Sequence, residues 1–193
     1  MKILVVVDMQ KDFIDGSLGT PEAQAIVPKV ADLIKAKADP NTVVIFTKDT
    51  HEANYLWTQE GKKLPIKHCI KDTVGHLINE EVSAAFYDNA KKYCDASKVS
   101  PLSDYEYILI EKPTFGSIDL QNALYTLDDI SGIEEITFCG LCTGICVLSN
   151  AILAKATLPE VPINVVADCC ACVTPASHNT ALEAMKLCQI NII

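Results

Sequence analysis

Short apolar runs alternate with amphipathic stretches along the whole chain. The apolar runs predict strands at 3–7, 42–47, 107–111, 135–139 and 162–167, with a last short one at 190–193. Apolar residues at helical spacing predict helices at about 21–37, 78–93, 117–126, 144–156 and 176–188. Because most of the strands are apolar on both faces, the pattern predicts a mostly parallel six-stranded sheet covered by helices on both sides. We therefore expect one three-layer α/β/α domain over residues 1–193.

Composition and charge narrow the class of protein. The chain has 193 residues and a formal net charge of −9, without a cluster of lysines and arginines. This charge argues against nucleic-acid partners and against anionic membrane surfaces. No apolar run approaches the roughly 18 residues of a transmembrane helix, and the first residues do not resemble a signal peptide. We expect a cytoplasmic protein that acts on a small molecule, and a homo-oligomer is compatible with this composition.

The nine cysteines raise the question of disulfides. Their number is odd, the chain is large enough to need no crosslinks, and no export signal is present, so reduced thiols are expected. Cys139 and Cys188 lie in apolar elements, where cysteine packs as a small core residue. Cys169, Cys170 and Cys172 suggest either packing or a metal or redox cluster. Their spacing matches no tetrahedral zinc pattern, which favours packing.

Three reactive side chains come at or soon after the ends of predicted parallel strands, namely Asp8, Lys112 and Cys146. Ligands of open α/β sheets bind outside the carboxyl ends of the strands, so these side chains can meet in one cleft. A thiol nucleophile, a carboxylate that accepts its proton and an ammonium that stabilises negative charge indicate a cysteine hydrolase. Taken singly, each residue has a plainer interpretation: a core cysteine, a turn-capping aspartate and a surface lysine.

The surroundings of Cys146 favour the reactive interpretation. Cys146 lies near the first turn of a predicted helix, just after Gly140 and Gly144. The partial positive charge of a helix N-terminus lowers a thiol pKa, and the N–H groups there can hold an oxyanion. We therefore expect the pKa of the Cys146 thiol to be lowered.

A second group of polar residues follows the second predicted strand. Asp49 and His51 alternate at its end and so point to the same side, and His68 lies further along the polar segment 49–72. Segments of this length without a clear period are often functional. One carboxylate and two imidazoles suit a divalent transition metal with open coordination positions. The plainer alternative is a capping aspartate with two surface histidines.

These motifs resemble those of the isochorismatase-like cysteine hydrolases, and among them the nicotinamidases. The segment 6–13, which contains Asp8, is similar to the opening motif that supplies the family's catalytic aspartate. The segment 140–147, which contains Cys146, is similar to the motif Gly-x-Ala-Thr-x-x-Cys-Val that carries the nucleophile. Lys112 occupies the position of the family lysine. The resemblance extends over essentially the whole chain and implies the isochorismatase-like hydrolase fold.

The resemblance implies hydrolysis of nicotinamide to nicotinate and ammonia, or of a related carboxamide, through a thioester on Cys146. Asp8 would accept the thiol proton, and Lys112 would assist and keep Asp8 ionised. A non-proline cis peptide is also implied between Leu141 and Cys142. It would aim the backbone N–H of Cys142, together with that of Cys146, at the oxyanion.

The resemblance further implies a metal. Asp49, His51 and His68 match the family's metal-binding pattern, and Asp168 and His178 match a later strand-helix segment. We expect one divalent ion per chain, zinc in the first place, with iron or manganese as alternatives. Its implied role is to orient a ring nitrogen of the substrate.

The substrate pocket follows from the same comparison. Phe13 matches a residue that packs on the substrate ring, and Leu64 and Leu141 are expected beside that ring. Several positions depart from the family pattern. A cysteine, Cys142, replaces the alanine of the nucleophile motif, and Leu64 stands where nicotinamidases often have tryptophan. The spacing from Pro65 to His68 is one residue longer, and the segment 112–117 differs from the usual one. Tyr55 or Trp57 either supplies a replacement ring or covers the loop.

Two other functions are compatible with these residues. An isochorismatase-type hydrolase of a vinyl ether would share the catalytic residues, but such enzymes generally lack the metal ligands. An inactive family member would serve as a binding or scaffold subunit, and the intact Asp8, Lys112 and Cys146 argue against that.

Overall fold

The computed structural model describes residues 1–37, 39, 41–93 and 108–193. Its strands are β1 (Lys2–Val7), β2 (Thr42–Asp49), β3 (Ile108–Lys112), β4 (Glu135–Leu141), β5 (Ile163–Ala171) and β6 (Asn191–Ile192). They form one sheet in the order β3-β2-β1-β4-β5-β6, and every neighbouring pair is parallel. The predicted six-stranded sheet is confirmed. Residue 107, expected at the start of the third strand, lies outside the described residues.

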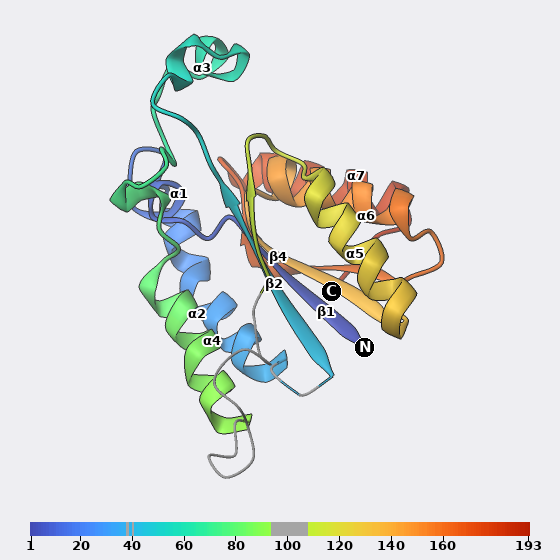
Figure 1. The fold of residues 1–193 in the computed structure, drawn as a ribbon. Helices are drawn as coiled ribbons and strands as arrows, with labels where there is room; N and C mark the ends of the chain where they lie inside the picture. The colour runs from blue at the N-terminus through green and yellow to red at the C-terminus, as the bar shows by residue number, and fades with distance from the viewer. Residues whose placement is uncertain (38, 40, 94–107) are drawn as a thin grey trace.

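Helices cover both faces of this sheet (Figure 1). One face carries α1 (Lys11–Ile14), α2 (Pro21–Lys37) and α4 (Glu80–Tyr93), and the other carries α5 (Ile118–Ser131), α6 (Leu148–Thr157) and α7 (Pro175–Leu187). The expected three-layer α/β/α architecture is therefore confirmed. Within the described ranges, no helix is long and apolar enough to cross a membrane.

The core is centred on β1, which lies between β2 and β4. Its residues 3–7 are at most 1% exposed, because helices cover both faces of the strand. Val5 is paired with Ile45 of β2 on one side and with Phe138 of β4 on the other, and both partners are buried. The unbroken apolar run is thus the signature of a central parallel strand.

The segment between β2 and α4, residues 50–79, extends beyond the sheet and contains three short helical elements. They are η1 (Tyr55–Trp57), α3 (Gln59–Lys63) and η2 (Val74–His76). The hydroxyl of Thr58 caps α3 by accepting a hydrogen bond of 3.0 Å from the N–H of Gly61. Figure 1 shows α3 projecting past the carboxyl ends of the strands. We call residues 50–79 the excursion.

The helix expected at 144–156 begins with a π-helical turn, Thr143–Val147, and continues as α6. This turn follows β4 directly, after the Leu141–Cys142 peptide, which is cis as the resemblance implied. Gly140 lies just before it, with a φ of +113°. A Cβ at this position would lie 2.1 Å from the carbonyl oxygen of Val7, so only glycine lets β4 pass β1 here.

Strand β5 is longer than the sequence indicates. It runs to Ala171, so Cys169 and Cys170 lie inside the strand and Cys172 follows it. All three are free thiols and at most 6% exposed. Their burial agrees with the packing interpretation of this cluster.

Candidate active site and metal centre

Asp8 begins the turn after β1 and is fully buried. Its φ of +48° is in the left-handed region, which aspartate adopts more readily than most residues other than glycine. Thr47 fixes the carboxylate, because its hydroxyl donates a hydrogen bond of 2.6 Å to Asp8 Oδ1. The backbone N–H of Asp8 also donates to the carbonyl oxygen of Thr47, at 3.2 Å.

Lys112, the last residue of β3, brings the three candidate catalytic groups together. Its Nζ lies 2.6 Å from Asp8 Oδ2 and 3.5 Å from Cys146 Sγ. It also lies 3.6 Å from Asp49 Oδ1 and donates a hydrogen bond of 3.1 Å to the carbonyl oxygen of Thr114. Burial disfavours the charged ammonium, but the negative charges of Asp8 and Asp49 outweigh this effect and raise the pKa of Lys112. Lys112 is therefore a buried cation.

Cys146 lies in the π-helical turn and is 5% exposed. Burial raises the pKa of its thiol well above the usual value, and Asp8 adds to this while Lys112 opposes it. The expectation of a lowered pKa was wrong, because the loss of solvent outweighs the effect of the helix start. Burial likewise raises the pKa of Asp8, against the opposing effect of Lys112. The site thus combines a thiol that holds its proton more tightly than usual with a carboxylate whose basicity is increased.

Asn150 ties the π-helical turn to the loop after Lys112. Its Nδ2 donates hydrogen bonds to the carbonyl oxygens of Cys146, at 2.8 Å, and Phe115, at 3.0 Å. Its Oδ1 accepts from the N–H of Ser117 at 2.9 Å. Asn150 is fully buried, and sequence analysis missed it because it interrupts an apolar helical pattern without any motif.

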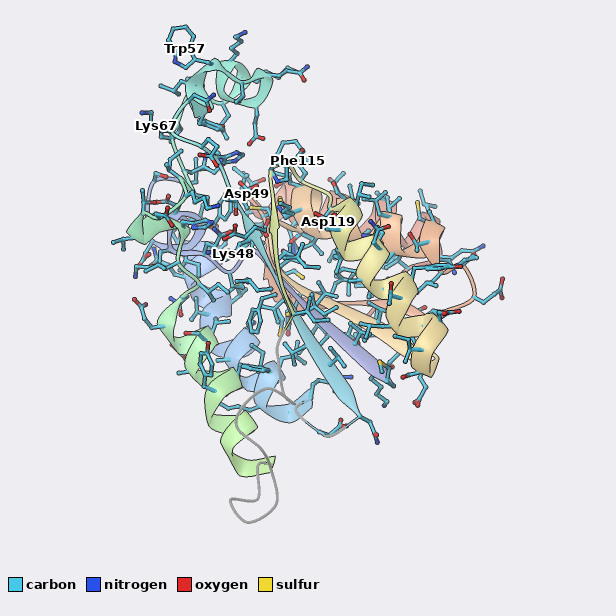
Figure 2. The ribbon with its side chains drawn as sticks, in the orientation of Figure 1. Lys48, Asp49, Trp57, Lys67, Phe115 and Asp119 are labelled. Carbon is cyan, nitrogen blue, oxygen red and sulfur yellow. The ribbon has the colours of Figure 1, made fainter. Side chains whose placement is uncertain are left out.

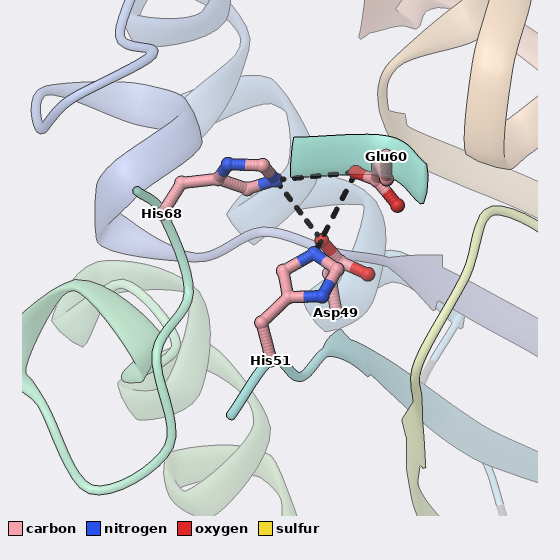
Figure 3. Close-up of side chains that lie close together, drawn as sticks. All are labelled: Asp49, His51, Glu60 and His68. Atoms are coloured by element: carbon pink, nitrogen blue, oxygen red, sulfur yellow. Dashed lines mark ion pairs between the residues drawn. The ribbon is translucent and has the colours of Figure 1, made fainter. Parts of the chain in front are cut away.

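Asp49, His51, Glu60 and His68 form a compact cluster beside the thiol site (Figure 3). One ligand atom from each residue lies within 4.8 Å of all the others. The two Nε2 atoms lie 2.8 Å (His51) and 3.4 Å (His68) from Asp49 Oδ2. Glu60 Oε1 lies 3.7 Å from both imidazoles. The structure brings together Asp49, His51 and His68, the three residues expected from the sequence. The sequence did not indicate Glu60, which comes from α3.

The donor set fits a divalent transition metal. Asp49 Oδ1 and His51 Nε2 are buried and make no hydrogen bond of normal geometry, although such atoms are usually paired. Burial disfavours the charge of Asp49, but the close contacts with His51 and His68 and the charge of Lys112 outweigh this effect and lower the pKa of Asp49, so the carboxylate is anionic. Two imidazoles and two carboxylates suit zinc, iron or manganese. His68 Nδ1 contacts the carbonyl oxygen of Ile66 at 2.8 Å, which turns Nε2 toward the cluster.

Gln10 and Asp12 hold the metal-cluster loops in place. Gln10 Oε1 accepts from the N–H of Asp49 at 2.7 Å, and its Nε2 donates to the carbonyl oxygens of Asp49 at 2.9 Å and His76 at 3.1 Å. Asp12 Oδ2 accepts from the N–H of Cys69 at 2.8 Å, next to His68. The turn after β1 therefore supplies Asp8 to the thiol site and two supports to the metal cluster.

A pocket of about 210 Å³ lies between the thiol and the metal cluster. Its wall includes Phe13, Leu64, Leu141, Cys142 and Cys146. It also includes members of the metal cluster and several apolar side chains, so most of its surface is apolar with one polar end. Such a pocket suits a small flat molecule with a few polar atoms.

Tyr55 and Trp57 have different positions. Tyr55 is fully buried and packs against the rings of His51 and His68, with ring centroids 4.6 Å and 4.9 Å away. Its hydroxyl donates to the carbonyl oxygen of Leu64 at 3.0 Å. Burial, Glu60 and Asp49 raise its pKa to about 12. Trp57 is 82% exposed and lies at the tip of the excursion, away from Asp49 (Figure 2). Tyr55 therefore supports the metal cluster, and neither ring lines the pocket.

The chain matches a known family along almost its whole length. Residues 2–193 match the isochorismatase domain, and the chain belongs to that family. A nicotinamidase/pyrazinamidase of Mycobacterium tuberculosis is 26% identical, over all of this chain and 98% of its own length. A nicotinamidase of Saccharomyces cerevisiae is 30% identical over an alignment of 110 residues, which covers 42% of this chain and 50% of the yeast protein.

Solved structures of related proteins have the same fold. A pyrazinamidase of Pyrococcus horikoshii in complex with zinc has a TM-score of 0.75 and 25% identity, over all of this chain and 98% of its own. A pyrazinamidase/nicotinamidase of Streptococcus mutans has a TM-score of 0.80 and 24% identity, over the full length of both chains. The expected isochorismatase-like fold is thereby confirmed.

Proposed function

We propose that this chain is an amidohydrolase that converts nicotinamide, or a closely related aromatic carboxamide, to the carboxylate and ammonia. The main support is the position of Lys112, whose Nζ lies within 3.6 Å of Asp8, Cys146 and Asp49. The lysine thus connects a thiol site to a metal cluster across one pocket. The curated relatives are nicotinamidases, and the fold agrees with theirs. We propose that residues 1–193 act as one domain.

The proposed reaction begins with proton transfer from the Cys146 thiol to Asp8. The sulfur attacks the amide carbonyl carbon, and the resulting oxyanion accepts hydrogen bonds from the backbone N–H groups of Cys142 and Cys146. Asp8 returns its proton to the amide nitrogen as the C–N bond breaks, which releases ammonia and leaves a thioester. Asp8 then takes a proton from the water that attacks the thioester carbonyl, and it passes this proton to the sulfur of Cys146 as the C–S bond breaks. This releases the acid and regenerates the thiol and the carboxylate. Lys112 stabilises the negative charge that passes between sulfur and carboxylate.

The raised pKa values of Asp8 and Cys146 suit this exchange. A buried thiol gives up its proton only to a nearby base, and burial makes the Asp8 carboxylate a better one. The transfer leaves the pair of groups at one net negative charge, and the ammonium of Lys112 balances this charge before and after it. Water-accessible bases are therefore not required for the first step.

The metal cluster accounts for orientation of the substrate. We propose that Asp49, His51, Glu60 and His68 hold one divalent ion, with zinc first and iron or manganese as alternatives. When bound, that ion would supply a Lewis-acid contact for a ring nitrogen. Phe13 would pack on the ring and Leu64 beside it. The cluster favours an amidase over an isochorismatase-type vinyl ether hydrolase, because the latter reaction has no use for such a contact.

Ammonia release from nicotinamide and benzamide tests this proposal. The two amides have the same shape, but benzamide has no ring nitrogen. We expect nicotinamide to be hydrolysed much faster, a chelator to remove most of that difference, and Cys146→Ser to be inactive. Equal rates for the two amides would show that the ring nitrogen is not recognised. Activity of a folded Cys146→Ser protein would refute the thioester.

A further inference from the structure

The π-helical turn that carries Cys146 is held at its first residue by a histidine outside the site described above. Thr143 opens the turn and is fully buried. Its Oγ1 lies 2.8 Å from Nδ1 of His178, a half-buried residue in the first turns of α7. Thr143 stands between Cys142 and Cys146, whose N–H groups we assign to the oxyanion. The contact therefore acts on the backbone that carries both proposed donors.

The turn has few other side-chain supports at this end. Cys142, the residue before the turn, makes no capping hydrogen bond through its side chain. Instead, its carbonyl oxygen accepts from the N–H groups of Ile145, at 3.0 Å, and Val147, at 3.1 Å. Asn150 supports the far end of the turn through the carbonyl oxygen of Cys146. The contact between Thr143 and His178 supplies a matching support at the near end.

His178 lies in the first turns of α7, where several contacts fix the start of the helix. The start of α7 has a capping box, in which the Thr174 hydroxyl accepts from the N–H of Ser177 at 3.1 Å and the Ser177 hydroxyl accepts from the N–H of Thr174 at 3.1 Å. Pro175 fixes the first helical position, and the N–H of His178 donates to the carbonyl oxygen of Thr174 at 3.0 Å. Because the start of α7 is fixed in this way, the side chain of His178 can hold Thr143 in one position.

The backbone of the π-helical turn also lies directly against α7. A Cβ at Gly144 would be 3.3 Å from the Cβ of Ala181 and 3.7 Å from the carbonyl oxygen of Ser177. This close approach leaves little room for the turn to shift toward α7. The hydrogen bond of Thr143 to His178 stops it from shifting away. Together the two restrict the turn in both directions.

We infer that His178 is a positioning residue for the oxyanion donors, an inference that rests on the proposed function. Its Nδ1 holds the hydroxyl of Thr143, and Thr143 holds the N–H groups of Cys142 and Cys146 where the oxyanion forms. Because the substrate ring is bound elsewhere in the pocket, loss of this contact affects the transition state more than substrate binding. It lowers kcat and leaves KM nearly unchanged.

The test uses a set of variants in the metal-loaded protein. His178→Ala and Thr143→Val remove the contact, and each should lower kcat for nicotinamide by about five- to tenfold, the effect of one lost hydrogen bond. His178→Asn should restore most of the rate, because the amide of asparagine reaches the position of Nδ1. His178→Gln should not, since its amide reaches the position of Nε2. Asn179→Ala, an exposed neighbour on α7, is the matched control.

A double variant separates positioning from general loss of packing. His178→Ala combined with Thr143→Val should be no slower than either single variant, because both remove the same contact. Independent, multiplying losses would overturn the inference. Equal losses in His178→Asn and His178→Gln would overturn it as well, since they would show that Nδ1 has no special part.

Amide hydrogen exchange in the substrate-free protein decides the matter without any substrate. The amides of 141–147 should exchange about five- to tenfold faster in His178→Ala than in wild type and return to normal in His178→Asn. Unchanged exchange in His178→Ala would overturn the inference even if nicotinamide is hydrolysed. If no amide is hydrolysed by the wild type, the proposed function fails, and the exchange result still decides the role of His178.

Discussion

Replacing Gln10 with leucine should destabilise the protein and weaken its metal binding together. Leucine is close to glutamine in size, so the change removes polar contacts with little change of volume. Gln10 is fully buried, and its amide makes three hydrogen bonds to backbone groups of Asp49 and His76. After the substitution, one N–H and two carbonyl groups would lie in the interior without these partners.

The size of the effect follows from those three bonds. Each backbone group that loses its partner and stays unpaired in the interior costs about 1–3 kcal/mol, so the loss of all three should lower the free energy of unfolding by about 3–9 kcal/mol. For a chain of this size, each kcal/mol corresponds to about 2–4 °C in Tm, which gives a decrease of at least about 6 °C. Removal of a group that orients a metal ligand typically weakens metal binding about 10- to 100-fold.

Two measurements check this prediction. Thermal unfolding in the presence of a chelator gives the effect on the protein alone, because bound metal would otherwise add its own stabilisation. Competition with a chromophoric chelator gives the Kd for zinc. Gln24→Leu, the same substitution at an exposed position of α2, should change neither quantity. If Gln10→Leu unfolds at the wild-type temperature and binds zinc equally well, the hydrogen bonds of Gln10 do not support the metal cluster.

Three further predictions concern single residues. Cys146→Ala should abolish ammonia release and keep Tm within about 4 °C of wild type, and a larger loss of Tm would mean that the thiol is mainly a packing group. Glu60→Gln should weaken zinc binding about tenfold in the chelator competition, whereas Glu52→Gln, at an exposed position of the same excursion, should not. Gly140→Ala should lower the free energy of unfolding by more than about 3 kcal/mol in urea, because its Cβ would overlap a carbonyl oxygen of β1. Gly132→Ala should cost less, about 1–3 kcal/mol, since its φ of +66° also strains a residue with a side chain but its Cβ would meet nothing within 4 Å.

The sheet could be predicted from sequence because each strand is marked by a short apolar run of its own. A central parallel strand needs apolar residues on both faces, and the run before Asp8 has them. Reactive side chains that follow such runs lie at the carboxyl ends of the strands, which is how Asp8, Lys112 and Cys146 could be expected together. The length of an element was less well indicated, as β5 shows, because its last residues are set by pairing with Gly140 and Leu141.

Glu60, Gln10 and Asn150 could not be predicted as site residues, because their roles depend on which distant segments of the chain come together in the fold. Glu60 joins the metal cluster only because the excursion folds back over β2, and no periodic pattern marks that path. Gln10 and Asn150 bind backbone groups far away in sequence, and a motif does not say which groups those are. The prediction of a lowered pKa for the Cys146 thiol was wrong for a related reason. The helix start was visible in the sequence, but the burial that outweighs it comes from packing of several elements.

The two halves of the site come from separate parts of the chain, and this has a consequence for how relatives of this protein would differ. Asp8, Lys112 and Cys146 lie at or just after the carboxyl ends of strands β1, β3 and β4. Three of the four metal-cluster residues belong instead to the excursion. A relative could therefore lose or replace the excursion, and with it the need for a metal, while its thiol chemistry stays intact. Gln10 and Asp12 would be decisive in such an exchange, because their side chains make hydrogen bonds from the segment after β1 to the backbone of the excursion. A graft of an excursion from another family member should succeed only when these two side chains meet backbone groups of matching position.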